Sequence, residues 1–171
     1  ASRSFDVETD LLMTNLWILK IDGQGNKISS QVVGGSRHDF VYSAWPCTNG
    51  DVVFAGFTDS DDVDNSQRRE NGDGWLLRMD RFGTIKWQNV FAGKFEDYFR
   101  KIAEDKEGRL ILAGNFESEE KSKQFWFLKV TYEGKRVAEK IFGDKQDEFL
   151  TSLWPMSDMG VVMTGYSSYV S

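Results

Sequence analysis

The sequence predicts an all-β protein made of three repeats, each of four short antiparallel strands. A run that begins with Trp and alternates apolar and charged residues occurs three times, at intervals of about 50 residues. Such alternation is typical of a half-buried strand. No segment has a helical period long enough to predict a helix. We therefore expect one domain, residues 1–171, with repeats at about 16–58, 74–117 and 125–166.

The first strand of each repeat begins at a Trp and ends at a Gly eight positions later. The alternating apolar residues between them predict one buried face. The Gly predicts the positive φ of a tight turn. Because the Trp holds the same position in every repeat, we expect it to lie in the core each time. The three runs are 17–25, 75–83 and 126–134.

Two further alternating runs follow in each repeat. The second run ends at a Gly, and an Asp four positions after that Gly precedes the third run. A residue pair ending in Gly then predicts a hairpin turn. The second runs are 28–33, 85–91 and 137–142, the third runs are 41–45, 99–103 and 150–154, and the turn pairs are Asn49-Gly50, Glu107-Gly108 and Met159-Gly160.

The fourth run of each repeat is almost continuously apolar, at 52–56, 110–114 and 161–165. A strand of this kind is typically covered on both faces, so we expect it near the centre of the assembly. The extra length of the first interval lies in the polar segment 59–74, which we expect to be a surface loop.

Composition excludes several classes of protein. The net charge of -6 and the pI near 4.9 disfavour nucleic acid as a partner, because nucleic-acid binders concentrate Lys and Arg on one face. The apolar runs are far shorter than the ~20 residues of a membrane-spanning helix. The single cysteine, Cys47, cannot form an intrachain disulfide, and we expect it to be a small buried residue.

The repeated string Trp-x-Leu-(Lys/Arg)-x-Asp-x-x-Gly, together with the later Asp and the apolar run ending in Gly, resembles bacterial β-propeller repeats. The resemblance covers residues 16–166 and implies that the chain is a partial β-propeller with one blade per repeat. It also implies an exported, periplasmic or cell-surface bacterial protein. It does not specify a function, because such repeats serve as scaffolds with unrelated roles. The third repeat departs from the pattern at Thr131, where the others have Asp, and at Gly143, where it has a single Gly.

Three blades cannot close a propeller ring, which generally needs four to eight. The chain could be a slice of a longer propeller whose further blades are missing. It could be half of a six-bladed homodimer. It could also be a β-trefoil, which closes with three four-stranded repeats. In the first two cases open blade edges would recruit partner strands.

Five residues are candidates for ligand binding. Asp39, Asp97 and Asp147 recur once per repeat and could bind cations or sugars, or each could cap a turn by accepting backbone N–H groups. Trp45 and Trp154 could stack on a sugar ring, or could pack between sheets.

A metal site is suggested by one polar loop, which holds Asp59, Asp61, Asp62 and Asp64. Several carboxylates within a short arc suit Ca²⁺, which is the only cofactor that the sequence suggests. The loop lacks the Asp-x-Asp-x-Asp-Gly spacing and the distal Glu of a calcium loop, and Val63 stands at a ligand position. A solvated acidic loop is the alternative.

Catalysis is not predicted, and we name no catalytic residue. The chain has one His and one Cys, and it has no nucleophile with a base and no metal-ligand cluster at a useful spacing. We expect a non-catalytic binding or scaffold module that mediates protein–protein contacts. The alternative is a carbohydrate-binding, lectin-like or carbohydrate-active domain. The expected partner is thus a protein or a glycan.

Overall fold

The computed structural model describes residues 13–64, 71–91, 93–120 and 122–168. These residues form strands, turns and loops without a helix, which confirms the all-β prediction, and they contain no helix that could cross a membrane. The strands are β1 (Leu16–Ile21), β2 (Lys27–Val33), β3 (Asp39–Pro46), β4 (Val52–Thr58), β5 (Asp73–Met79), β6 (Ile85–Phe91), β7 (Tyr98–Glu104), β8 (Leu110–Glu117), β9 (Lys123–Val130), β10 (Arg136–Phe142), β11 (Glu148–Pro155) and β12 (Val161–Ser167).

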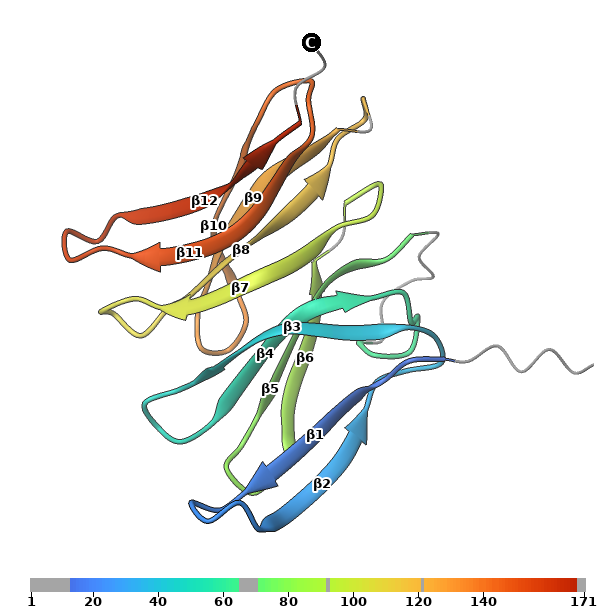
Figure 1. The fold of residues 1–171 in the computed structure, drawn as a ribbon, viewed down its shortest axis with the longest axis vertical. Helices are drawn as coiled ribbons and strands as arrows, with labels where there is room; N and C mark the ends of the chain where they lie inside the picture. Colours follow the sequence, from blue (N-terminus) through green and yellow to red (C-terminus); the bar gives the residue numbers. More distant parts are fainter. Residues whose placement is uncertain (1–12, 65–70, 92, 121, 169–171) are drawn as a thin grey trace, which may run out of the picture.

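The strands form four antiparallel sheets (Figure 1). A hairpin of β1 and β2 lies at one end and a hairpin of β11 and β12 at the other. Two four-stranded sheets, β3-β4-β5-β6 and β7-β8-β9-β10, lie between them. The described strands thus form sheets of two, four, four and two strands instead of the expected three four-stranded units. They form no closed barrel, so the β-trefoil alternative is not supported.

Each sequence repeat runs from one sheet into the next. In the second repeat, β5 and β6 complete the sheet begun by β3 and β4, whereas β7 and β8 begin the following sheet. The segment 59–72 therefore connects two neighbouring strands of one sheet, β4 and β5. The short segments that follow β2, β6 and β10 carry the chain between sheets. The length of a connecting segment does not show whether it joins two sheets or two strands of one sheet, because a longer loop adds little closure entropy.

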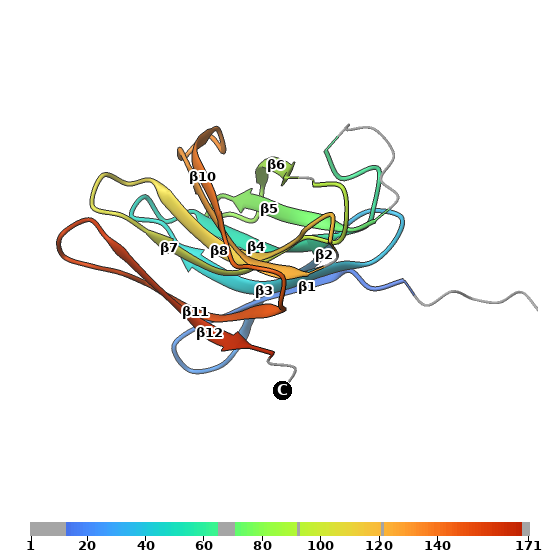
Figure 2. The same cartoon turned by 90° about the horizontal axis from the view of Figure 1, so that it is seen from above.

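The sheets pack face to face in succession. The first strands of successive sheets contact each other, β3 with β7 and β7 with β11. Strands β6 and β10 project to the side away from β11 and β12 (Figure 2). We call β3, β7 and β11 the inner strands. In each sheet the remaining strands follow in order from the inner strand outward.

The core consists of apolar clusters between successive sheets. Between the two four-stranded sheets, the rings of Phe99 and Trp126 stack with centroids 4.3 Å apart. Trp75 and Trp126 are each 1% exposed, as predicted. The prediction for Trp17 is wrong, since its side chain is 63% exposed. No described strand covers that face of β1.

The burial of the fourth run of each repeat also depends on whether neighbouring sheets cover it. In β8 the residues from Leu110 to Asn115 are buried, as expected for a strand covered on both faces. Strand β4 is buried or half-buried along its whole length. Strand β12 is mostly exposed, because no described sheet packs on its outer face.

The predicted turns are largely confirmed. Gly25, Gly83 and Gly134 have φ values of 88°, 94° and 78°, in the region that favours glycine. In the last hairpin the positive φ of 69° falls on Met159 and not on the Gly that follows it.

Candidate functional site

The repeated Asp residues lie at the start of β3 and directly before β7 and β11, and they connect each sheet to the one before it. Asp39 N–H donates to Thr14 O at 2.6 Å, and Asp97 N–H donates to Gly72 O at 3.0 Å. Both acceptors lie three residues before the repeated Trp of the preceding sheet. The two Asp residues therefore hold equivalent positions in successive sheets.

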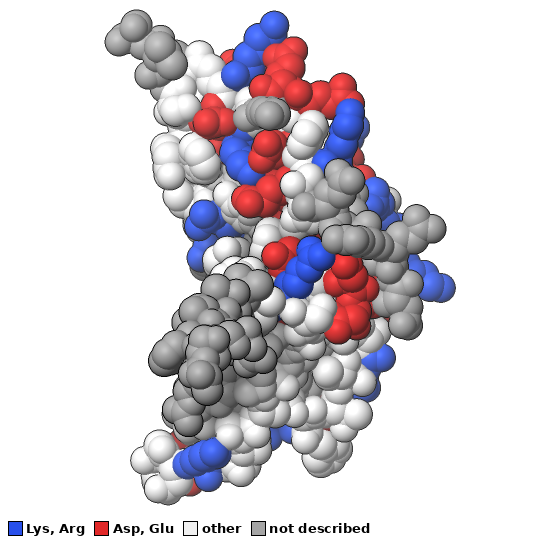
Figure 3. All heavy atoms as spheres, turned by 90° about the vertical axis from the view of Figure 1, so that its right-hand side faces the viewer, with Lys and Arg blue, Asp and Glu red and all other residues white. Residues whose placement is uncertain are grey.

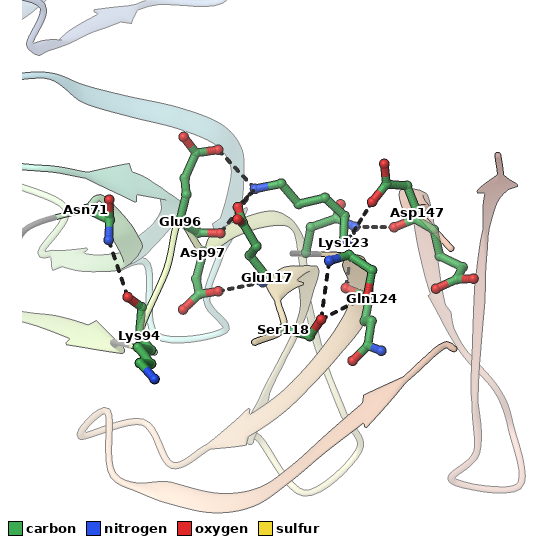
Figure 4. Close-up of polar contacts among 12 residues, drawn as sticks. Asn71, Lys94, Glu96, Asp97, Glu117, Ser118, Lys123, Gln124 and Asp147 are labelled. Atoms are coloured by element: carbon green, nitrogen blue, oxygen red, sulfur yellow. Dashed lines mark hydrogen bonds and ion pairs between the residues drawn. The ribbon is translucent and has the colours of Figure 1, made fainter. Parts of the chain in front are cut away.

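The third Asp makes a related contact through its side chain (Figure 4). Asp147 Oδ1 accepts a hydrogen bond from Lys123 N–H at 2.8 Å. The Lys123 ammonium lies 2.7 Å from Glu117 Oε2 and 3.3 Å from Glu96 Oε1. Burial alone would lower the pKa of Lys123, but these carboxylates raise it. Acidic and basic side chains also interleave on the molecular face in Figure 3.

The carboxylates of Asp39 and Asp97 differ in the hydrogen bonds that they accept. Asp39 accepts from Thr58 Oγ1 at 2.5 Å and from Gly35 N–H at 2.7 Å. Asp97 Oδ1 accepts from Glu117 N–H at 2.9 Å, whereas its Oδ2 has no hydrogen-bond partner among the described residues. Burial raises the pKa of both groups, and that of Asp97 to about 7. All three Asp residues engage the protein's own groups, in line with turn capping, and ligand binding by them stays a prediction.

The acidic loop is held against the segment that links β2 to β3. The residues that the structure describes contain no group of three or more His, Cys, Asp or Glu that could hold a metal ion. The calcium site therefore stays a prediction. The contacts are Asp59 Oδ1 with His38 N–H at 2.5 Å, Asp61 with Arg37 at 3.6 Å, Asp62 Oδ1 with Ser36 N–H at 2.8 Å, and Asp64 Oδ2 with Val90 N–H at 3.0 Å.

The two candidate Trp residues do not form one platform. Trp45 is half-buried against the next sheet, and its Nε1 donates to Glu104 Oε2 at 3.2 Å. Trp154 is 70% exposed. They lie on β3 and β11, with β7 between these strands (Figure 1).

A β-bulge lies at the same place in each inner strand. The pairing register skips Tyr42 in β3, Arg100 in β7 and Thr151 in β11. A bulge leaves its residue out of the ladder and re-aims the side chain. The backbone frame is thus repeated in the three strands while the bulge residue changes.

Two of these bulge residues line a pocket of about 300 Å³, together with Phe40, Glu96 and Tyr98. The Arg100 guanidinium lies 5.1 Å from the ring centroid of Tyr98 and 5.6 Å from that of Tyr42. The two tyrosine rings meet edge to face at 5.9 Å. Burial raises the pKa of Tyr42 despite the nearby positive charge of Arg100.

Neither Tyr42 nor Arg100 was predicted from the sequence. One feature of the sequence could have indicated them. The residue three positions after the repeated Asp is Tyr after Asp39 and Arg after Asp97, while the surrounding alternation of apolar and polar residues is kept. That signal becomes clear only when the bulge is known.

A larger cleft of about 570 Å³ separates the β1–β2 hairpin from the next sheet, with Ile18, Phe54 and Phe82 among its lining residues. Gln31 spans it by donating to Gly83 O at 3.1 Å. The terminal hairpin is therefore packed less closely than the sheets at the centre.

The outward face of β1 is apolar and open. Trp17, Leu19 and Ile21 are 63%, 44% and 54% exposed. The residues at the same positions of β5 are at most 5% exposed because the preceding sheet covers them. These counterparts are Trp75, Leu77 and Met79.

A scan of the chain against protein-family models finds no match, and a search of curated proteins finds none either. The resemblance to propeller repeats therefore stays an interpretation of the residues.

Proposed function

We propose that the chain is a non-catalytic scaffold module of β-propeller-type repeats that binds a protein partner through its two terminal sheets. The observation that carries this proposal is the exposed apolar face of β1. The side chain of Trp17, the largest on that face, is 63% exposed. An exposed apolar strand at a sheet edge is a template for pairing with another chain. From the resemblance, we propose an exported or cell-surface bacterial location.

The partner that best fits these edges is a second copy of the chain. In the two complete sheets, Gly56 pairs with Trp75 and Gly114 pairs with Trp126. Among the described strands, β12 pairs only with β11 and β1 only with β2. The equivalent register would set Gly165 of one copy opposite Trp17 of the other. The new sheet β11-β12-β1-β2 would have the strand order of the complete sheets.

A dimer joined at both ends would have six four-stranded sheets. That number lies within the range of closed propellers, and a two-fold arrangement gives β1 and β12 of each copy a partner strand. The apolar faces of β1 and β12 would then be covered by sheets, as the faces of β5 and β8 already are.

Light scattering during size exclusion tests this proposal. We expect a mass close to twice the 19.6 kDa of the chain. Trp17→Glu should give a folded monomer, because a carboxylate would be placed in the new core. Phe82→Glu is the matched control: Phe82 is 80% exposed in the turn after β5 and should leave the dimer intact. A wild-type chain that stays monomeric at high concentration would contradict the proposal.

Carbohydrate binding is the second candidate function. It is favoured by the aromatic rings around Arg100, since Phe40 and Tyr42 are 39% and 46% exposed at the pocket. Flat exposed rings offer apolar surface to a sugar face. Titration of the chain with neutral and acidic sugars tests it.

A further inference from the structure

The pocket between β3 and β7 holds a guanidinium without an anionic partner. Arg78, Arg109 and Arg136 each form an ion pair with a carboxylate. The Arg100 side chain forms no hydrogen bond or ion pair within the part of the chain that the structure describes, and its Nε is buried without a partner. Burying a polar group without a hydrogen bond is costly, so an unpaired, half-buried guanidinium calls for an explanation.

The position of Arg100 prepares it for an anion. The rings of Tyr42 and Tyr98 hold the guanidinium, with centroids 5.6 Å and 5.1 Å away. Ring stacking leaves the N–H groups of a guanidinium free to bind a carboxylate in the plane of its fork. The bulge in β7 takes Arg100 out of the pairing ladder and so directs it away from its own sheet.

The rest of the pocket suits a small polar ring. Its volume of about 300 Å³ is at the low end for ligand sites, enough for one ring but not for an extended ligand. The exposed rings of Phe40 and Tyr42 offer a flat apolar surface. Glu96 lies on the rim, exposed, with a carboxylate that can accept hydrogen bonds from hydroxyl groups.

We propose that this pocket binds a carboxylate-bearing sugar, such as one hexuronate unit of an acidic glycan. The sugar carboxylate pairs with Arg100, the face of the sugar ring lies on Tyr42, and ring hydroxyls donate to Glu96. This inference rests on the second candidate function and does not depend on the scaffold proposal. It adds the requirement that the sugar carry a negative charge, because Arg100 must pair with it. The equivalent bulge residue is Tyr in β3 and Thr in β11.

Isothermal titration of the full chain with D-glucuronate, D-glucose and benzoate tests the proposal. We expect glucuronate to bind, with an affinity that falls as NaCl is added. Glucose and benzoate should bind at least about tenfold more weakly, since each lacks the carboxylate or the hydroxyl groups. Arg100→Gln should weaken glucuronate binding about tenfold or more.

Arg81→Gln is the matched control. The guanidinium of Arg81 also lies over an aromatic ring, 4.9 Å from the centroid of Phe82, but it is outside the pocket. We expect this variant to bind glucuronate as the wild type does. If Arg100→Gln does not fold, Tyr42→Ala and the salt dependence of the wild type provide the same test at the same site.

Each contrary outcome has a distinct meaning. Equal binding of glucose and glucuronate would overturn the charge requirement but leave carbohydrate binding standing. Binding of benzoate without glucuronate would overturn both, and so would the absence of binding by all three probes. Unchanged glucuronate binding by Arg100→Gln would overturn the proposed site.

Discussion

Gly56 lies directly opposite Trp75 in the β4–β5 pair, and the same pair recurs in the next sheet as Gly114 and Trp126. The inner strand comes very close to both glycines. A Cβ placed on Gly56 would lie 1.8 Å from Phe40 O, and one on Gly114 would lie 1.9 Å from a backbone oxygen of β7. The adjacent bulge sets this approach, so the glycine, the bulge and the buried Trp form one structural unit.

Gly114→Ala should therefore destabilise the protein. The added methyl group would displace backbone, and we expect a loss of about 1–3 kcal/mol or more in the free energy of unfolding. Gly23→Ala is the control, because a Cβ there meets no atom within 4 Å. Urea denaturation of the two variants measures the difference, and equal midpoints would contradict the prediction.

Asp97→Asn should remove part of the dependence of stability on pH. The folded pKa of Asp97 is about 7, raised from 3.8 chiefly by burial. The folded state then binds a proton more tightly than the unfolded state, so stability falls as pH rises from about 4 to about 7. The effect is at most about 4 kcal/mol. Asn removes the ionisation and keeps an oxygen that can accept from Glu117 N–H.

Denaturation at about pH 5 and about pH 8 tests whether stability falls as the pH rises. The stability lost by the wild type between the two pH values should exceed the loss in Asp97→Asn. Asp144→Asn, at an exposed carboxyl, should leave the wild-type pH dependence unchanged. Parallel pH profiles for the wild type and Asp97→Asn would show that Asp97 does not titrate as proposed.

Arg78→Met should be among the most damaging substitutions. Arg78 and Asp51 are 8% and 4% exposed, and Nη2 and Nε of Arg78 both contact Asp51 Oδ2, at 2.6 Å and 2.8 Å. Arg78 also donates to Tyr132 O in the turn of the next sheet. Arg78→Met would leave the buried Asp51 carboxylate with the Lys86 ammonium, 3.3 Å away, as its remaining cation among the described residues. Breaking a buried ion pair costs about 3–5 kcal/mol, and the Lys86 contact places the expected loss at the lower end.

The matched control for this pair is Arg136→Met. Arg136 pairs with Glu139 on the surface, where such pairs contribute at most about 1 kcal/mol. Thermal denaturation should therefore separate the two variants clearly. Similar melting temperatures would mean that the Arg78 pair is no more important than a surface pair.

Met159→Gly should stabilise the last hairpin. Met159 has a φ of 69°, and its N–H donates to Met156 O in the turn. In the equivalent turns Gly50 and Gly108 hold this position with φ values of 86° and 76°. A left-handed conformation costs about 1–2 kcal/mol for a residue other than glycine. We expect part of that cost to be recovered as a higher melting temperature, and an unchanged or lower value would contradict this account.

The strands and turns could be predicted from the sequence because they depend on local patterns. The alternation after each repeated Trp and the glycine that ends it specify a strand and a turn wherever they occur. The grouping of strands into sheets is not local. The long loop 59–72 suggested a boundary, but β4 and β5 on either side of it pair along their whole length.

Burial and the candidate site depend on neighbours that a repeat pattern does not specify. Trp17 and Trp75 belong to the same motif, yet only Trp75 has a sheet packed on its ring. The position of Arg100, three residues after Asp97, gains meaning only from the bulge, and a bulge is a property of a strand pair. The repeated Asp residues drew attention instead, and their described contacts are with the protein itself.

The last prediction concerns the register between two copies of the chain. In the complete sheets Val53 pairs with Arg78 and Ile111 pairs with Lys129. The equivalent pair across the proposed dimer is Val162 with Lys20. The double variant Lys20→Cys, Val162→Cys should therefore form a disulfide between chains, since opposite residues in a strand pair meet the distance requirement of that bond.

The control is the double variant Lys20→Cys, Tyr166→Cys. Both of its positions are exposed, but Tyr166 lies four residues further along β12, roughly 13 Å from the paired position and too far for a disulfide. Under mild oxidation, non-reducing electrophoresis should show a covalent dimer for the first variant only. Because β1 and β12 lie at opposite ends of the described chain (Figure 1), a bond within one molecule does not explain such a band. Equal cross-linking of both variants would mean that the edges associate without the proposed register.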